Sequence, residues 1–413
     1  LLSVCAMMPR ASMLHGYASL LCCAASTLLV AVKAEAEASS CSGAAPSSQT
    51  PISVVSYNVL SDSLCTDSYY QLSPPGACDA AARLERVKGK LMGEIEAVPR
   101  GAGLQERPRP ILCLQEVSRS WAAALVPFFE KHNYAYATAL YGNEHSGYMG
   151  QCLAWPRESF EVEAVDTPRI ADTVPQWKRP RAKRELDVQP GWKKLLQALG
   201  LGTGGKQEEG KGRRDEFPLD PWAEAKRRYN CAVIARLKDK RTGRHFVIGD
   251  YHMPCLFGSD KKCQVMVAHA SLLFQHVDRW AAGAPYIVAG DFNLKPQDPL
   301  YEFITSGGAV PEGHPQHPPP APWDSSWRPM FPGARSAYAS HLGQEPELTN
   351  FARRNEESDE FSATLDYIWM SREWHVNGVR SLPNRKDLKP PIKSFPTNEE
   401  PSDHLLIRAE LTL

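Results

Sequence analysis

Short apolar runs rich in β-branched residues recur along the chain, and most of them end at a polar residue. Runs of this length and composition predict β-strands. The run that begins at residue 111 reaches Leu114 and ends at Glu116. The other expected strands cover residues 52–56, 230–235, 245–250, 286–289 and 405–413.

Helical periodicity fills several of the intervals between these strands. Asp79 can cap a helix that runs to about residue 97, and Ser118 can cap a second one. A third helix is expected at about 260–280, where apolar residues recur at helical spacing. Strands that alternate with helices, without a gap in the core pattern, predict one α/β domain over residues 51–413.

Two segments interrupt the pattern. Residues of about 166–227 are rich in lysine and arginine and show little periodicity, which predicts a basic surface insertion with one short helix near 192–199. Residues of about 306–335 are dense in proline and glycine and predict a loop.

The first fifty residues have a different character. They begin with Leu1, and Met7 or Met8 is a plausible start. The mostly apolar stretch 18–32 resembles a secretory signal and is short for a membrane span, but upstream non-coding sequence or an organellar presequence explains it equally well. Residues 33–51 have the composition of a disordered linker. Location therefore stays open between a secretory or organellar compartment and the cytoplasm.

Composition narrows the functional classes. Hydrophobic residues make up 43% of the 413 residues, which excludes wholesale disorder, and no stable membrane span is expected. The formal net charge is zero, so any nucleic-acid contact must come from a local patch or a metal. The eleven cysteines form no CxxC pair, which disfavours structural zinc. Cys65 with Cys78, and Cys255 with Cys263, could form disulfides in an oxidising compartment.

Six polar motifs lie at the ends of expected strands. Side chains two positions apart on a strand point the same way, so Asp291 and Asn293 should share one face, as should Asp250 and His252. Asp403 and His404 are adjacent and must lie in a turn to act at one site. The motifs are Ser-Tyr-Asn-Val-Leu (56–60), Leu-Gln-Glu-Val (114–117), Asp-Tyr-His (250–252), Gly-Asp-Phe-Asn (290–293), Leu-Asp-Tyr-Ile (365–368) and Ser-Asp-His (402–404).

These residue types suit the hydrolysis of a phosphodiester. Carboxylates hold Mg²⁺, which neutralises charge on the phosphate, and another carboxylate can act as general base. An imidazole can hold a phosphoryl oxygen, and a carboxylate behind it keeps it protonated. Glu116, Asp291, His404 and Asp366 can fill these four roles. Each motif alone is weak, because Gly-Asp-Phe-Asn is commonly a tight turn and a lone His252 is more often a core histidine.

The ordered set resembles the endonuclease/exonuclease/phosphatase superfamily, also called DNase I-like. Its branch of carbon-catabolite-repressor-type deadenylases, nocturnin, Angel proteins and 2′,5′-phosphodiesterase is the most similar pattern. That branch is indicated by residues 56–60, by Arg-Tyr-Asn (228–230) and by Glu-Leu-Thr-Asn (347–350) upstream of 364–368. The resemblance covers residues 52–413, apart from the basic insertion and parts of the proline-rich loop.

The resemblance implies a four-layer α/β sandwich of two packed mixed β-sheets flanked by helices, with the site at one edge. It implies Mg²⁺, for which Mn²⁺ can substitute, held by Glu116 with Asn58 and Asp403 beside it. Asp291 would orient or deprotonate the nucleophile with help from Asn293, and His252 and His404 would bind the phosphate, with Asp366 behind His404. Phe361 would stack on a base of the substrate. A buried core position for Phe361 in a hairpin is an equally good prediction from the sequence.

The chain departs from the family at two places. The family usually has Asn or Thr at the position of Asp250, so this acid is expected near the phosphate, where it holds a cation or fixes His252. The segment between Asn350 and Phe361 is longer and more charged than in the branch, which weakens the case for poly(A) specificity.

The leading functional hypothesis is an Mg²⁺-dependent 3′–5′ RNA exonuclease of the deadenylase type. The alternative enzyme acts on a smaller nucleotide ester, such as a 2′,5′-oligoadenylate, a cyclic phosphate or a dinucleotide. A non-enzymatic RNA-binding scaffold is the third reading, and it is disfavoured because none of the expected acids or histidines is missing. The expected partner is RNA or another nucleotide phosphodiester.

Overall fold

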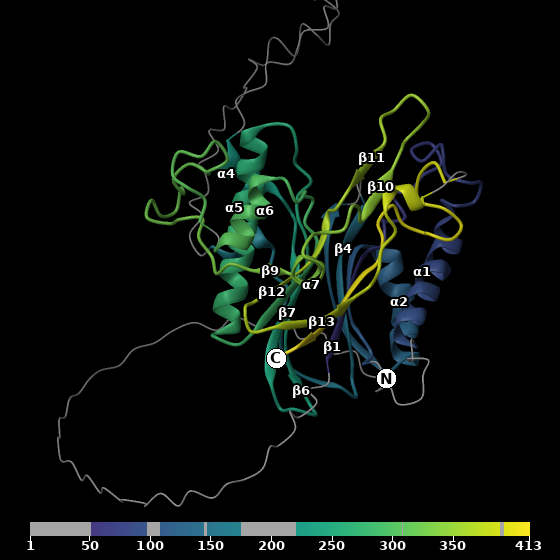
Figure 1. Ribbon diagram of the computed structural model, residues 1–413, viewed down its shortest axis with the longest axis horizontal. Helices are drawn as coiled ribbons and strands as arrows, with labels where there is room; N and C mark the ends of the chain where they lie inside the picture. The colour runs from purple at the N-terminus through teal and green to yellow at the C-terminus, as the bar shows by residue number, and fades with distance from the viewer. Residues whose placement is uncertain (1–50, 97–107, 144–146, 175–219, 308, 389–391) are drawn as a thin grey trace, which may run out of the picture. The chain divides into compact units, whose positions relative to one another are not determined.

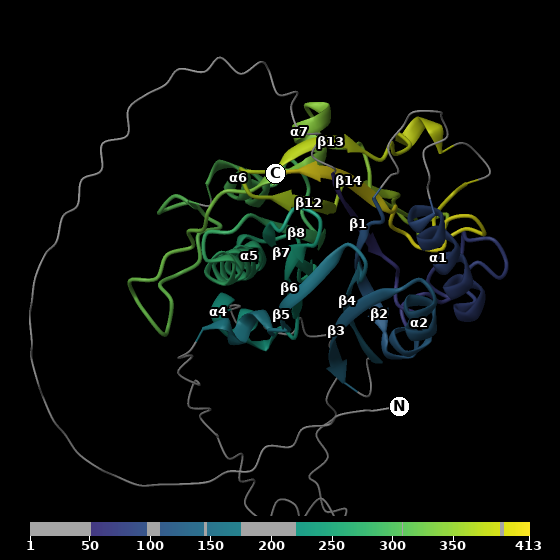
Figure 2. The ribbon, with the colours of Figure 1, turned by 90° about the horizontal axis from the view of Figure 1, so that it is seen from below.

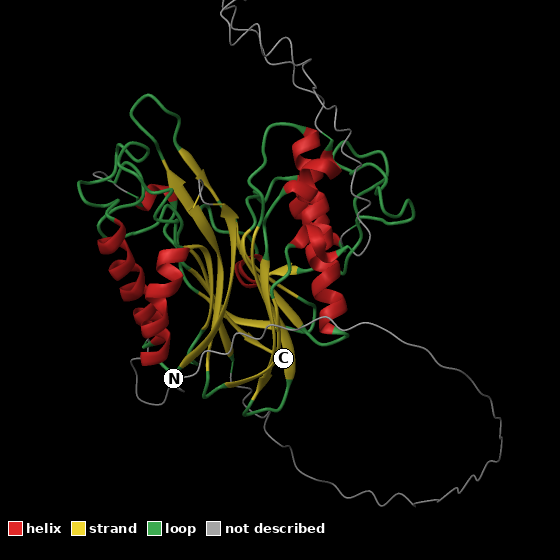
Figure 3. Ribbon diagram, turned by 180° about the vertical axis from the view of Figure 1, so that it is seen from behind, coloured by secondary structure: helices red, strands yellow, loops and turns green. Residues whose placement is uncertain are grey.

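Two six-stranded β-sheets pack face to face in the computed structural model, and helices cover the outer face of each (Figure 3). The structure describes residues 51–96, 108–143, 147–174, 220–307, 309–388 and 392–413. Residues 49–413 form one compact unit. The expected four-layer α/β sandwich is therefore confirmed.

The first sheet has the strand order β13-β14-β1-β2-β4-β3. β1 and β2 pair in parallel, and the other neighbours are antiparallel. Its strands are β1 (Ile52–Asn58), β2 (Ile111–Ser118), β3 (Tyr134–Asn143), β4 (Gly147–Pro156), β13 (His375–Val379) and β14 (Ile407–Thr412).

The second sheet has the order β5-β6-β7-β8-β12-β9, in which only β7 and β8 pair in parallel. A separate hairpin pairs β10 with β11 (Figure 1). The strands are β5 (Phe160–Asp166), β6 (Ala232–Asp239), β7 (His245–His252), β8 (Tyr286–Asp291), β9 (Arg335–Ser336), β10 (Asn350–Ala352), β11 (Phe361–Ala363) and β12 (Asp366–Met370).

Helices α1 and α2 cover the first sheet, and α5 covers the second (Figure 2). The side chains of Asp79 and Ser118 cap α1 and α2 as expected, each by accepting a backbone N–H. The helices are α1 (Ala80–Ile95), α2 (Arg119–Lys131), α4 (Pro221–Arg227), α5 (Asp260–Ala281), α6 (Pro299–Ser306) and α7 (Ala337–Leu342), with 3₁₀ turns η1 (Ile170–Thr173) and η2 (Arg385–Asp387).

Strand alternation builds the layers. On β1, Val54 points between the two sheets, while its neighbour Val55 points outward to α1 and α2. Residues on β7 alternate in the same way, with Ile248 between the sheets and Val247 packed toward α5. A strand that is buried on both faces has a continuous run of apolar residues, and such runs predicted these strands from the sequence.

The expected basic insertion (residues 166–227) is a surface loop by prediction, but residues near both of its ends are buried in the core. Ile170 in η1 and Trp222 and Ala225 in α4 are buried in the core beneath α5. The short helix expected near 192–199, the leader and the linker lie outside the described residues. Residues 309–334 contain no helix or strand, in agreement with the expected loop.

All seven described cysteines are free thiols, so neither proposed disulfide is formed. Burial raises the pKa of the Cys65 thiol to about 12. No described helix is long and apolar enough to cross a membrane.

Candidate active site

Strand register assembles one side of the site in the second sheet. His252 at the end of β7 is the register partner of Asp291 on β8, and Asp291 is in turn the partner of Asp366 on β12. Neighbouring strands lie about 4.8 Å apart, so this register alone brings the three side chains within reach of one another. In the first sheet, the end of β1 supplies Asn58 and β2 supplies Glu116.

Two backbone irregularities aim these side chains. β2 bulges against β4 between Leu114 and Val117, and Glu116 within this bulge has a φ of 58°. A bulge redirects a side chain at a strand end. Gly290 has a φ of 149°, and a Cβ there would lie 1.8 Å from the carbonyl oxygen of Tyr251. Only glycine therefore permits the close approach of β7 and β8 next to Asp291.

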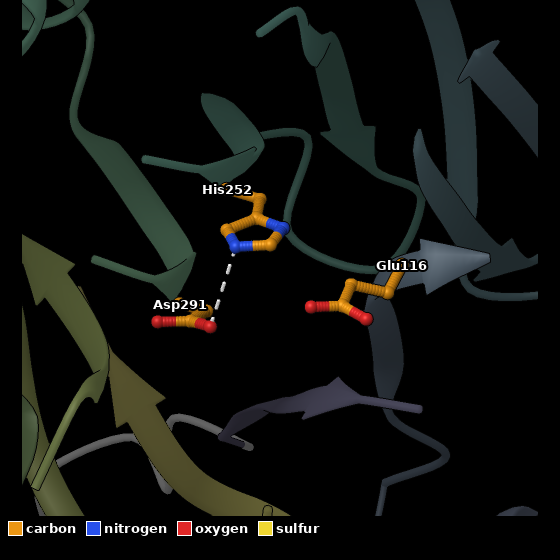
Figure 4. Close-up of side chains that lie close together, drawn as sticks. All are labelled: Glu116, His252 and Asp291. Atoms are coloured by element: carbon orange, nitrogen blue, oxygen red, sulfur yellow. Dashed lines mark ion pairs between the residues drawn. The ribbon is translucent and has the colours of Figure 1, made fainter. Parts of the chain in front are cut away.

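Glu116, His252 and Asp291 converge between the two sheets (Figure 4). One ligand atom from each lies within 4.8 Å of the others, and His252 Nε2 is 3.5 Å from Asp291 Oδ2. The Asn58 amide joins the two acids, since its Nδ2 donates to Glu116 Oε1 at 3.1 Å and to Asp291 Oδ2 at 3.0 Å. The structure thus brings together four residues from four different strands.

A second cluster shares Asp291. His404 Nδ1 lies 2.8 Å from Asp366 Oδ2, and His404 Nε2 lies 3.6 Å from Asp291 Oδ2. Burial lowers the pKa of His404, but the carboxylates of Asp366 and Asp291 outweigh it and hold that pKa well above its usual value. The Thr349 hydroxyl donates to Asp366 Oδ2 at 2.6 Å and fixes this carboxylate. His404 is therefore an imidazolium that can donate from Nε2 to an anion.

Asn293 orients the groups next to it. Its backbone N–H donates to Asp291 Oδ1 at 2.9 Å, and its Nδ2 lies 3.1 Å from His252 Nε2. With Asn58 on the other oxygen, both oxygens of Asp291 accept a hydrogen bond, which fixes the orientation of this carboxylate.

Asp403, which was expected beside Glu116, contacts Tyr70. It belongs to neither described cluster of possible metal ligands, and its Oδ2 accepts from the Tyr70 hydroxyl at 2.9 Å. Its Oδ1 is buried without a hydrogen-bond partner among the described residues.

The donor set fits a divalent cation. Glu116 and Asp291 are close and have no lysine or arginine partner among the described salt bridges, so a cation would relieve their repulsion. Hard cations of the Mg²⁺ type take oxygen ligands, which Glu116, Asp291 and the Asn58 carboxamide can offer. The orphaned Asp403 Oδ1 is a further oxygen at this edge.

Asp250 is fully buried, which corrects the expectation that it lies near the phosphate. It shares a face of β7 with His252, but this face points between the sheets, and Asp250 lies about 7 Å further from the edge. Its side chain is fully buried, and Oδ1 accepts from Gln115 Nε2 at 2.7 Å. Burial raises the pKa of Asp250 well above its usual value, although the Gln115 hydrogen bond opposes this. Burial thus disfavours the charged form of this acid.

Asp250→Asn is expected to stabilise the protein at neutral and alkaline pH. The folded pKa lies above the unfolded value of about 3.9, so the parent loses stability as pH rises from about 4 through the folded pKa. The variant keeps an acceptor for Gln115 and has no charge to bury, so its advantage should grow over that window. Thermal unfolding at pH 5 and pH 8 measures this, and activity should change by less than about threefold. An equal difference at both pH values would contradict the assignment.

Phe361 on β11 is half-buried and lines a cavity of about 370 Å³, where the Lys295 ammonium lies 5.2 Å from its ring centre. It is therefore not a core residue, and its ring is accessible for stacking.

Two supporting residues had escaped the sequence analysis. Arg83 on α1 is fully buried and donates to the carbonyl oxygens of Val59 and Pro401, which ties the ends of two motifs together. Arg83 lies four residues before Val87, on the apolar face of the expected helix, and this position could have predicted a buried arginine. Tyr70 lies in an irregular loop, where no periodicity marks it.

Comparisons with known proteins agree with this geometry. The model of the Endonuclease/Exonuclease/phosphatase family matches residues 55–404. The CCR4-Not complex 3′-5′-exoribonuclease subunit Ccr4 of Phaeosphaeria nodorum is 23% identical over 88% of this chain and 60% of its own length. Nocturnin of Rattus norvegicus is 28% identical over 42% of this chain and 35% of its own length. The chain thus spans no more than about 60% of the curated relatives that it matches.

Solved structures show the same fold. ANGEL2, described as a 2′,3′-cyclic phosphatase, aligns with a TM-score of 0.60 at 18% identity, covering 88% of this chain and 95% of its own. The human nocturnin catalytic domain aligns with a TM-score of 0.51 at 18% identity, covering 88% of this chain and 93% of its own. The family match spans most of the chain and includes both carboxylate–histidine clusters. The chain belongs to the Endonuclease/Exonuclease/phosphatase family.

Proposed function

We propose that this chain is a Mg²⁺-dependent phosphodiesterase that removes nucleotides from the 3′ end of RNA. The main support is that the two sheets bring Glu116, His252 and Asp291 together with the Asp366–His404 pair. Similarity to Ccr4, a 3′-5′-exoribonuclease by name, supports the choice of RNA as substrate.

Each side chain of the site has a separate role in the proposed hydrolysis. A bound Mg²⁺, held by Glu116 and neighbouring oxygens, would neutralise phosphate charge and stabilise the leaving oxygen. Asp291 accepts the proton of the attacking water. His404 donates from Nε2 to a non-bridging phosphate oxygen, and Asp366 keeps it protonated. His252 offers a second nitrogen to the phosphate, oriented by Asn293.

The substrate is tested with the purified full chain in Mg²⁺. A 5′-labelled RNA should shorten stepwise from its 3′ end and release mononucleotides, whereas DNA of the same sequence should be a poorer substrate. Oligo(A) beside mixed RNA reports on poly(A) preference. Conversion of a 2′,3′-cyclic phosphate or a 2′,5′-oligoadenylate without shortening of RNA would overturn the proposal in favour of a small-ester phosphodiesterase.

Metal removal gives a separate prediction. Chelation should abolish turnover, and added Mg²⁺ or Mn²⁺ should restore it, because the clustered carboxylates repel an anionic substrate without a cation. Bound metal should also raise the thermal unfolding midpoint, since it binds only the folded protein. Undiminished turnover in excess chelator would show that the cation is dispensable.

A further inference from the structure

A basic groove lies next to α4. It is a cavity of about 880 Å³, and we call it the Tyr229 groove. It shares no lining residue with the cavity beside Phe361, so the two are separate places at which a substrate strand can be held. The lining residues used below are Leu64, Tyr141, Arg169, Arg227, Arg228 and Tyr229.

The wall of the groove is firmly built. Trp222 anchors α4, since it is buried and its indole N–H donates to the Pro319 carbonyl oxygen at 2.7 Å. The buried His269 of α5 contacts the Ala225 carbonyl oxygen through Nε2 at 3.0 Å. Arg169 pairs with Cys231 in an isolated β-bridge, so the backbone on both sides of Tyr229 is fixed. The wall is therefore preformed.

The surface that this wall presents is cationic and aromatic. Arg227 is 79% exposed and Tyr229 is 58% exposed, which is high for a tyrosine with no partner in the core. The Arg169 guanidinium lies 5.2 Å from the Tyr229 ring centre. Among the lining residues, Glu224 is the one acid, and it pairs with Arg227 and Arg228. A cationic groove with an exposed ring is the arrangement by which proteins hold single-stranded nucleic acid.

Hydrogen bonds connect residues that line the groove, or lie near its lining residues in the chain, to the catalytic residues. Asn230, next to Tyr229, donates from Nδ2 to the His252 carbonyl oxygen at 2.8 Å. Leu64 lies in the loop that follows Ser61, whose backbone N–H donates to Glu116 Oε2 at 3.1 Å. Tyr141 lines the groove and is also close enough to Glu116 to feel its charge. Burial, and then the Glu116 carboxylate, raise the pKa of the Tyr141 hydroxyl. A strand whose scissile phosphate lies at the acids can therefore extend into the groove.

We propose that the Tyr229 groove binds RNA nucleotides beyond the two that flank the scissile phosphate, with a base stacked on Tyr229 and a backbone phosphate at Arg227. This inference rests on the proposed exoribonuclease function. It assigns the described ends of the basic segment to substrate binding and makes affinity depend on substrate length.

The test uses Tyr229→Ala and Arg227→Ala in the full chain, with Lys131→Ala as control. Lys131 is exposed and is the last residue of α2, whose first residue follows the strand that carries Glu116. For a ten-nucleotide RNA, Tyr229→Ala should raise KM about tenfold and leave kcat nearly unchanged, and Tyr229→Phe should restore KM because it keeps the ring. For a dinucleotide, kcat/KM should change less than about twofold.

Arg227→Ala has its own readout in salt dependence. Loss of one phosphate contact should flatten the slope of log K against log salt by about 0.7 for the decamer. Binding is measured with a fluorescent RNA in excess chelator, independently of turnover. Equal losses on dinucleotide and decamer, or no change on either, would overturn the groove assignment while the exoribonuclease function stands. Failure of the parent to shorten any RNA, with a small ester consumed, would instead remove the function on which it rests.

Discussion

Glu116→Ala is expected to lower turnover by about 10³-fold or more, which corresponds to ~4 kcal/mol at 1.4 kcal/mol per tenfold. The residue lies in the β2 bulge with a φ of 58°, and its two oxygens accept from Asn58 and from the Ser61 backbone. These contacts hold the carboxylate where it can bind a cation but add no positive charge. Its removal therefore takes away cation affinity.

The fold should survive this change. Alanine is about as strained as glutamate at this φ, and one fewer carboxylate near Asp291 relieves repulsion in the metal-free protein. The unfolding midpoint without metal should stay the same or rise, while the Mg²⁺-dependent rise seen in the parent should disappear. Glu161→Ala, at an exposed position of β5, is the matched control. Retention of metal-dependent stabilisation by Glu116→Ala would place the cation elsewhere.

Asp291→Asn is expected to lower kcat by about 10²- to 10⁴-fold, the usual contribution of a general base. Both oxygens of Asp291 accept hydrogen bonds, from Asn58 Nδ2 and from the Asn293 backbone. An amide at this position keeps one acceptor but sets its NH₂ group against one of these donors. It also cannot take a proton from water.

The measurement is single-turnover cleavage of labelled RNA, which separates chemistry from product release. Glu116 remains in this variant, so RNA binding in Mg²⁺ should be retained. Asp278→Asn, exposed on α5, is the matched control. A variant that cleaves within about threefold of the parent would show that Asp291 serves only to orient its neighbours.

Local patterns determined the elements of this fold. Each apolar run between 52 and 289 that was expected to be a strand is one, and helix starts at Asp79 and Ser118 follow from side chains that accept nearby N–H groups. Such signals are local, so one sequence suffices to find them. The ordered motifs likewise located Asn58, Glu116, His252, Asp291 and His404.

The tertiary structure alone decided how deep each side chain lies and what it meets. Asp250 and His252 are equivalent by strand alternation, yet the first sheet buries Asp250 against Gln115 while His252 reaches the edge. The period of two gives the face of a strand, but the packing of the opposite sheet gives the environment of that face.

The sequence by itself thus determined the α/β class, the strand-end placement of the polar motifs and their chemistry, because hydrophobic period and capping are properties of neighbouring residues. Only the tertiary structure decided that Ile170 and Trp222 belong to the core, that Tyr70 reaches Asp403, and that Arg227 and Tyr229 line one groove with Leu64 and Tyr141. These contacts join residues far apart in the chain, and their partners are set by how the two sheets and α5 pack.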